Sequence, residues 1–214
     1  VTQTTFEYLG QRMFFLNRIQ PVSMHHLGPV LLALSTAGPV ILAGGPDWLR
    51  RLCASRPARR AMHAIQQPAL AALLFVGLFY LWLVPSVHFV AMLDPVLYQV
   101  MNWTMVLDGI LFWALVLDTR PAPPARVGFG VRAILAIAVM FPQILLGALI
   151  TFATVDIYPY YEFCGRIFPE IDAVADQQIG GLVIWLPPAM MSILSLVLVL
   201  RTMNRAERGT AGAS

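Results

Sequence analysis

The stretch DQQIGGLVIWLPPAMMSILSLVLVL, Asp176 to Leu200, decides the fold class. From Ile179 onward it holds no charged residue, and it reaches the roughly 20 mostly apolar residues that a helix needs to cross a bilayer. Inside a bilayer every backbone N–H and C=O must be satisfied within the segment, so such a run forms a helix. The stretch therefore predicts a membrane-spanning helix that begins just after three polar residues.

Four further windows have the same character, so we predict an all-α, polytopic transmembrane bundle with five spans. In chain order they are Val22–Gly44, Pro68–Val87, Val96–Leu117 and Val131–Thr154, with Ile179–Leu200 as the fifth. The composition agrees, because 58% of the 214 residues are hydrophobic and only 12% are charged, whereas a soluble domain has about 25% charged residues. We expect an integral membrane protein without a soluble domain.

Arginine sets the expected orientation. The chain has no lysine, and 11 of its 14 basic residues lie in three segments, 50–60, 120–132 and 201–208. Cytoplasmic loops of membrane proteins carry an excess of basic residues, so these segments are expected on the cytoplasmic side. The N-terminus is then outside, the C-terminus inside, and the outer face acidic. The basic balance thus indicates topology and does not indicate nucleic-acid binding.

The sequence also predicts three parts of the chain. Residues 1–21 form a lead-in, residues 22–201 the five-span membrane domain, and residues 202–214 a cytoplasmic tail. Within the lead-in, apolar residues recur at helical spacing: Phe6, Leu9, Met13 and Leu16. This pattern predicts an amphipathic helix on the outer membrane surface that stops near Pro21, with a frayed segment as the alternative.

The longest outer loop and the start of the fifth span carry aromatic and polar residues. Tyr158 and Tyr161 are expected at the outer interface, where amphipathic rings are favoured. Asp176 is expected to cap the N-terminus of its own helix. Two glutamines, Gln177 and Gln178, bring donors and acceptors that can cross-link neighbouring helices.

Two motifs in this region resemble the polytopic CtaG family. The first is Tyr158-Pro159-Tyr160-Tyr161, and the second is Ala175–Leu182 followed by Trp185-Leu186-Pro187. Weaker matches extend the resemblance from about Ser23 to Leu200: Ala37–Pro46, Gln67-Pro68, Leu81-Trp82 and Gly109–Trp113. The resemblance implies a non-enzymatic factor in assembly of a bacterial cytochrome c oxidase. It would assist copper delivery at the periplasmic face of the inner membrane.

The chain departs from the family pattern where the family carries histidines in its helices. His26 matches the first of two histidines four residues apart, but Val30 occupies the second position and Leu83 a third. Further matching positions hold Tyr98, Met101 and Asn102. A divergent member of this kind also fits a second function, that of a stable, non-catalytic accessory subunit of a respiratory haem-copper oxidase or supercomplex. A small transporter is less favoured, because the chain shows no internal repeat.

Copper is the metal that the resemblance implies, and it favours thioether and imidazole ligands. The candidate ligands are Met24, His25, His26 and His88, all expected at outer ends of spans or in an outer loop. Adjacent residues on an α-helix point about 100° apart, so His25 and His26 share one small site only if the helix is distorted. A haem held by His26 and His88 is the less favoured alternative.

Asp108 is the one acid inside a predicted span. Such acids usually face the bundle interior and suggest function. A place in the cytoplasmic half, with a hydrogen bond to Asn or Gln or a contact with a partner subunit, is favoured over a proton path, because no second acid or base continues a relay. The expected partners are oxidase or other respiratory subunits and the lipid bilayer. Trp185 and the Tyr and Asp-Gln-Gln motifs are the expected contact residues.

Overall fold

The computed structural model describes residues 5–35, 37–123 and 125–211, and all regular structure in these ranges is helical. In chain order the helices are α1 (Thr5–Gly10), α2 (Phe14–Val22), the π-helix η1 (Ser23–Leu27), α3 (Gly28–Leu34), α4 (Ala37–Gly44), α5 (Asp47–Ala54), α6 (Arg56–Ile65), α7 (Pro68–Leu83), α8 (Pro85–Leu93), α9 (Pro95–Val116), α10 (Phe129–Thr151), α11 (Tyr160–Phe163) and α12 (Ala173–Ala211). The predicted all-α fold class is confirmed.

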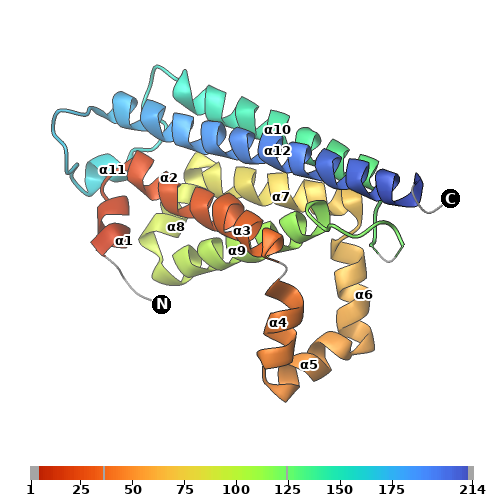
Figure 1. Cartoon of the computed structure of the whole chain (residues 1–214). Helices are drawn as coiled ribbons and strands as arrows, with labels where there is room; N and C mark the ends of the chain where they lie inside the picture. Colours follow the sequence, from red (N-terminus) through yellow and green to blue (C-terminus); the bar gives the residue numbers. More distant parts are fainter. Residues whose placement is uncertain (1–4, 36, 124, 212–214) are drawn as a thin grey trace.

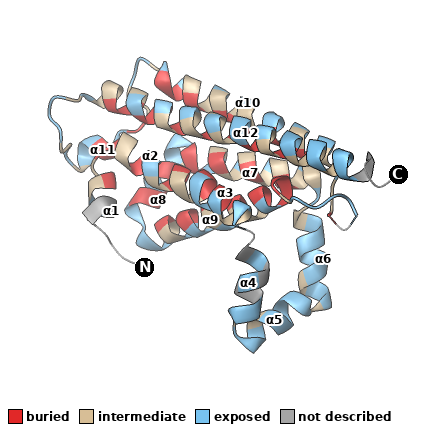
Figure 2. Cartoon of the chain, in the orientation of Figure 1, coloured by how far each residue is buried: buried red, intermediate tan, exposed pale blue. Residues whose placement is uncertain are grey.

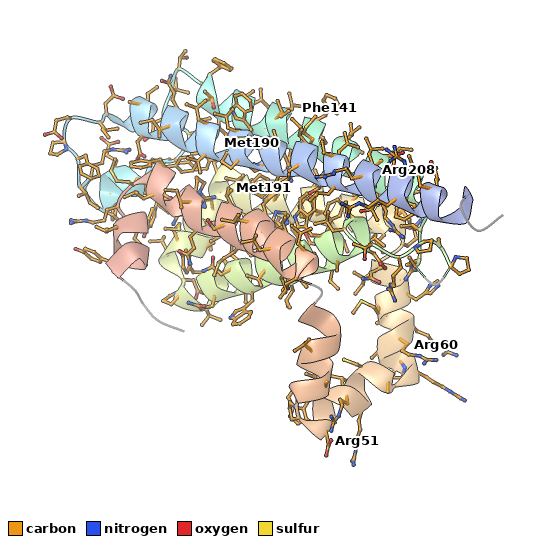
Figure 3. All side chains as sticks on the ribbon, in the orientation of Figure 1. Arg51, Arg60, Phe141, Met190, Met191 and Arg208 are labelled. Carbon is orange, nitrogen blue, oxygen red and sulfur yellow. The ribbon has the colours of Figure 1, made fainter. Side chains whose placement is uncertain are left out.

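The long helices form one elongated bundle. α10 and α12 run side by side along its length, α2 packs on α12, and η1 and α3 pack on α9 (Figure 1). Buried residues face inward (Figure 2), whereas large apolar side chains such as Phe141 and Met190 are exposed on the outside (Figure 3). An exposed apolar surface of this extent is what a bilayer covers.

Three helices are each long and apolar enough to cross a membrane: α9, α10 and the part of α12 from Ala173 to Gly209. α6 and α7 qualify only as a pair, and this pair is bent by 74°. The described residues thus hold three or four candidate spans, fewer than the five predicted, and the protein is a multi-pass membrane protein.

The first bundle helix begins earlier than predicted. α2, η1 and α3 follow one another directly, so the chain is helical from Phe14 to Leu34. The expected stop near Pro21 is wrong, because Pro21 lies inside α2. The expected surface location of α2 is also wrong. Phe14, Asn17, Arg18 and Pro21 recur on one helix face and are buried in the bundle, and this packing outweighs the local cost of the proline.

Helices α4, α5 and α6 form an arm that stands away from the bundle (Figure 1). Neither α5 nor α6 has a buried residue. α6 joins the bundle near the end where α7 begins and α12 ends (Figure 1).

The α9–α10 loop closes the same end of the bundle. The guanidinium of Arg132, itself buried, donates hydrogen bonds to the carbonyls of Asp118, Arg120 and Val127. The loop is thereby tied to the first turn of α10. Burial alone would raise the pKa of Asp118, but the hydrogen bonds and positive charge of Arg120 lower it below its ordinary value.

Candidate functional site

A polar cluster lies inside the bundle at the π-helix η1. In η1 the Gly28 N–H bonds to the Ser23 carbonyl, which is the i→i+5 pattern of a π-turn. The wider turn brings the neighbouring residues His25 and His26 both into the interior, where their exposed fractions are 0% and 1%. π-turns inside longer helices are frequent at functional sites. The distortion that a shared site requires is therefore present.

The two imidazoles are held by different helices. His25 Nε2 lies 3.3 Å from Asp108 Oδ2 on α9, and His26 Nε2 lies 3.3 Å from Gln143 Oε1 on α10. The two rings meet edge to face, with centroids 4.7 Å apart. The ring of Phe75 on α7 stacks on His25 at 4.0 Å. Four segments of the bundle thus converge on one buried polar cluster.

Gly109, next to Asp108 on α9, lets the π-turn approach. A Cβ atom on Gly109 would lie 2.9 Å from Pro29 Cγ and 3.0 Å from the carbonyl carbon of His25. Both distances are too short for packed atoms. Two neighbouring residues of α9 therefore contact η1. Asp108 is hydrogen-bonded to the His25 side chain, and Gly109 leaves room for the His25 main chain.

The structure corrects the expected surroundings of Asp108. Its hydrogen-bond partner is a histidine and not Asn or Gln, so it lies beside the two histidines. Because the helix starts at Phe14, His25 and His26 lie near the middle of the 14–34 stretch and not at its outer end. Gln143 was missed, although it is a polar residue inside the predicted span Val131–Thr154.

The four predicted copper ligands do not gather at one site. Met24 lines a groove of about 290 Å³ between η1, α3 and α9, together with Pro29 and Val106. His88 lies on α8, not in a loop, and its Nε2 is 2.9 Å from the Tyr161 hydroxyl. Within the described residues, no group of three or more His, Cys, Asp and Glu side chains is placed to hold a metal ion.

Asp176 forms the centre of a second polar network, at the end of the bundle where α2 begins. Its Oδ2 accepts the Phe14 N–H and its Oδ1 the Phe15 N–H, both at 2.9 Å. Its carboxylate also pairs with Arg166. The expected cap on its own helix is wrong, because α12 starts at Ala173 and is capped by Asp172, which accepts the Ala175 N–H at 2.8 Å. Asp176 instead caps α2.

The next residue, Gln177, cross-links as predicted. Its Oε1 accepts the Ile157 N–H at 2.6 Å, and its Nε2 donates to the Val155 carbonyl at 3.1 Å and to the Ile150 carbonyl at 3.4 Å. Gln177 thus joins α12 to the end of α10 and to the following loop. Gln178 is half-buried beside it.

Glycines on α10 and α12 let neighbouring groups approach. A Cβ atom on Gly147 would lie 2.6 Å from Trp185 Cβ, so Trp185 packs directly on the α10 backbone. On α12, Gly181 faces the backbone of Thr151, and Gly180 faces the ring of Phe14. These contacts fix α10, α12 and α2 together beside the Asp176 network.

The tyrosines of the outer loop, which were expected at the outer interface, are buried inside the protein. The Tyr158 hydroxyl donates to the Leu83 carbonyl at 2.8 Å, and its ring stacks on Phe14 at 4.3 Å. Tyr161 is 0% exposed. Burial raises the pKa of Tyr158 to about 12 and raises that of Tyr161 as well. These rings fill the core between α2, α7 and α8 because their hydroxyls find partners there.

Comparison with known proteins identifies the family. The family model described as cytochrome c oxidase caa3 assembly factor, Caa3_CtaG, matches residues 1–206. No curated protein matches the chain, and no solved structure matches it. The resemblance seen in the Tyr-Pro-Tyr-Tyr and Asp-Gln-Gln motifs is thereby confirmed, and the chain belongs to the Caa3_CtaG family of assembly factors for caa3-type cytochrome c oxidase.

Proposed function

We propose that this protein serves oxidase assembly without catalysing a reaction, as a five-span protein of the bacterial inner membrane. It would hold copper at the His25–His26 pair and contact oxidase subunits through the end of the bundle that Asp176 organises. The observation that carries the proposal is the π-turn, which places two adjacent imidazoles in the bundle interior.

The proposed topology rests on the separation of charge between the two ends of the bundle. The arm, the α9–α10 loop and the C-terminal end of α12, which carry most of the arginines, lie at one end (Figure 1). The acids of the loop between α10 and α12 lie at the other end. Under the positive-inside rule the first end is cytoplasmic and the second periplasmic. The five spans would be the 14–34 stretch, α7 with α8, α9, α10 and α12.

The ring nitrogens of His25 and His26 are donor atoms of a type that binds copper. The Nδ1 atoms of His25 and His26 are buried and have no hydrogen-bond partner, and imidazole nitrogen is a suitable copper ligand. Asp108 and Gln143 contact the Nε2 atoms, and such outer partners fix the orientation of a ligating ring. Met24 and His88 lie in separate surroundings, so we leave them out of this site.

Metal analysis of the tagged chain, purified in gentle detergent, tests the proposal. We expect about one copper per chain in the parent, loss of copper in His25→Ala and His26→Ala, and retention in His63→Ala, which removes an exposed histidine of α6. Oxidase subunits should co-purify in small amounts only. A chain without copper that co-purifies with oxidase subunits at equal stoichiometry would refute copper delivery and indicate an accessory subunit.

A further inference from the structure

Two short helices of the arm, α5 and α6, each have an apolar and a cationic face. At 100° per residue, the apolar faces carry Trp48, Leu49, Leu52 and Cys53 on α5 and Ala58, Ala61, Met62 and Ile65 on α6. The opposite faces carry Arg50 and Arg51 on α5 and Arg56, Arg59 and Arg60 on α6. Such a division is typical of helices that lie in a membrane interface.

Neither face is covered by the rest of the chain. Trp48 is 65% exposed and Leu52 55% exposed, although both are large and apolar. The five arginines of these helices are opposed by Asp47 alone, which pairs with Arg50. An uncovered apolar face next to a strong positive charge is complementary to a surface that is both apolar and anionic.

The direction of the arm matches that of a membrane surface. α6 is bent by 74° from α7, so if α7 crosses the bilayer, α6 runs close to the membrane plane. Arg126 in the α9–α10 loop donates to the carbonyls of Met62 and His63 at the end of α6 and braces this angle. Arg60 points away from α4, and Arg51 points outward at the tip of the arm (Figure 3).

We propose that α5 and α6 form a docking surface for the anionic phospholipids of the bilayer in which the bundle sits. The apolar faces enter the acyl boundary, and the arginines pair with phosphate headgroups. Basic residues near an anionic membrane each add to the attraction. Binding of α5 and α6 to lipid would fix the arm beside the bundle and hold the bundle at a constant tilt in the membrane. This role does not depend on whether the histidine pair holds copper.

Cys53 provides a reporter, because it lies on the apolar face of α5 and is exposed in the chain alone. In a Cys164→Ser background, the 214-residue chain is placed in nanodiscs of neutral phosphatidylcholine or of phosphatidylcholine with phosphatidylglycerol. The rate of Cys53 alkylation by an uncharged, water-soluble maleimide is then measured. We expect a rate at least tenfold lower in the anionic nanodiscs at low salt, with the difference reduced at high salt because salt screens the attraction.

Two triple variants separate lipid docking from general charge effects. Replacing Arg56, Arg59 and Arg60 by Gln should bring the rate in anionic nanodiscs to within about twofold of the neutral value, since each arginine near the surface contributes about a factor of five. Replacing Arg201, Arg205 and Arg208 by Gln removes equal charge from the exposed end of α12 and should leave the protection unchanged. Equal rates in both lipids, or protection in detergent that rises with protein concentration, would overturn the proposal, the latter in favour of a second copy.

Discussion

Removing the carboxylate of Asp176 should loosen the docking of α2 on α12. In Asp176→Ala, the N–H groups of Phe14 and Phe15 lose their acceptors, and Arg166 loses its closest acid and keeps only Asp156, at 3.8 Å. A buried donor left without a partner costs about 1–3 kcal/mol. This cost applies to the Phe14 N–H, whereas the Phe15 N–H is only partly buried and can regain a bond to water. The free energy of unfolding should therefore fall by about 1–3 kcal/mol.

The matched control is Asp172→Ala on the same helix. Asp172 also caps a helix N-terminus, through the Ala175 N–H, but it is exposed. Loss of a cap of this kind costs about 0.5–2 kcal/mol, and water can replace the lost acceptor. Asp176→Asn should fall between the two alanine variants, because its amide keeps one acceptor oxygen and brings a donor toward the second N–H or toward Arg166.

The assay is unfolding of the purified protein in mixed micelles by titration with SDS, followed by circular dichroism. Limited proteolysis at the α1–α2 end tests whether the loss is local. If Asp176→Ala unfolds at the same SDS fraction as Asp172→Ala, then the 2.9 Å contacts from Phe14 and Phe15 do not hold α2 in place, and the reasoning fails.

Three further predictions use the same titration or a protease. Gly109→Ala should destabilise the protein by about 1–3 kcal/mol through overpacking. The control Gly77→Ala has open space around its Cβ position and should be neutral or stabilising by up to about 1 kcal/mol. Equal effects of the two variants would contradict the close approach of η1 to α9. Tyr161→Phe should cost about 1–3 kcal/mol because it leaves a buried histidine nitrogen without its partner, and an unchanged transition would count against this hydrogen bond. Arg132→Met should leave three loop carbonyls without donors and speed tryptic cleavage in the α9–α10 loop, and an unchanged cleavage rate would show that the loop is held by other contacts.

The spans were predictable where an apolar run is long and unbroken. α9 and α10 match two of the predicted windows closely, because bilayer length sets their extent, whereas α12 contains the window Ile179–Leu200 and runs past it at both ends. The first window, Val22–Gly44, failed at both ends. The helix starts earlier, because Asn17 and Arg18 look like surface residues in the sequence and yet are buried against neighbouring helices. It also ends at Leu34, and the rest of the window forms α4 in the arm. Local polarity cannot indicate that a polar side chain has a partner on another helix.

The candidate residues were found more readily than their roles. Asp176 and Gln177 were identified as hydrogen-bonding residues, but the helix that Asp176 caps precedes it by about 160 positions in the chain. The tyrosines were identified by their residue type, which favours both an interface and a core in which the hydroxyl finds a partner. Only the three-dimensional contacts distinguish these two environments.

The π-turn shows most directly how a local distortion depends on distant residues. A regular α-helix here would direct His25 and His26 about 100° apart. It would also leave the His25 carbonyl without its usual donor, because Pro29, four residues on, has no N–H. The wide turn is stable here because Asp108 and Gln143 are each hydrogen-bonded to one imidazole, and because Gly109 leaves space for the displaced main chain. Each of these three residues lies on a helix more than 80 positions away. The turn and its polar cluster are therefore one cooperative unit, built from Pro29 nearby and from Asp108, Gly109 and Gln143 on distant helices.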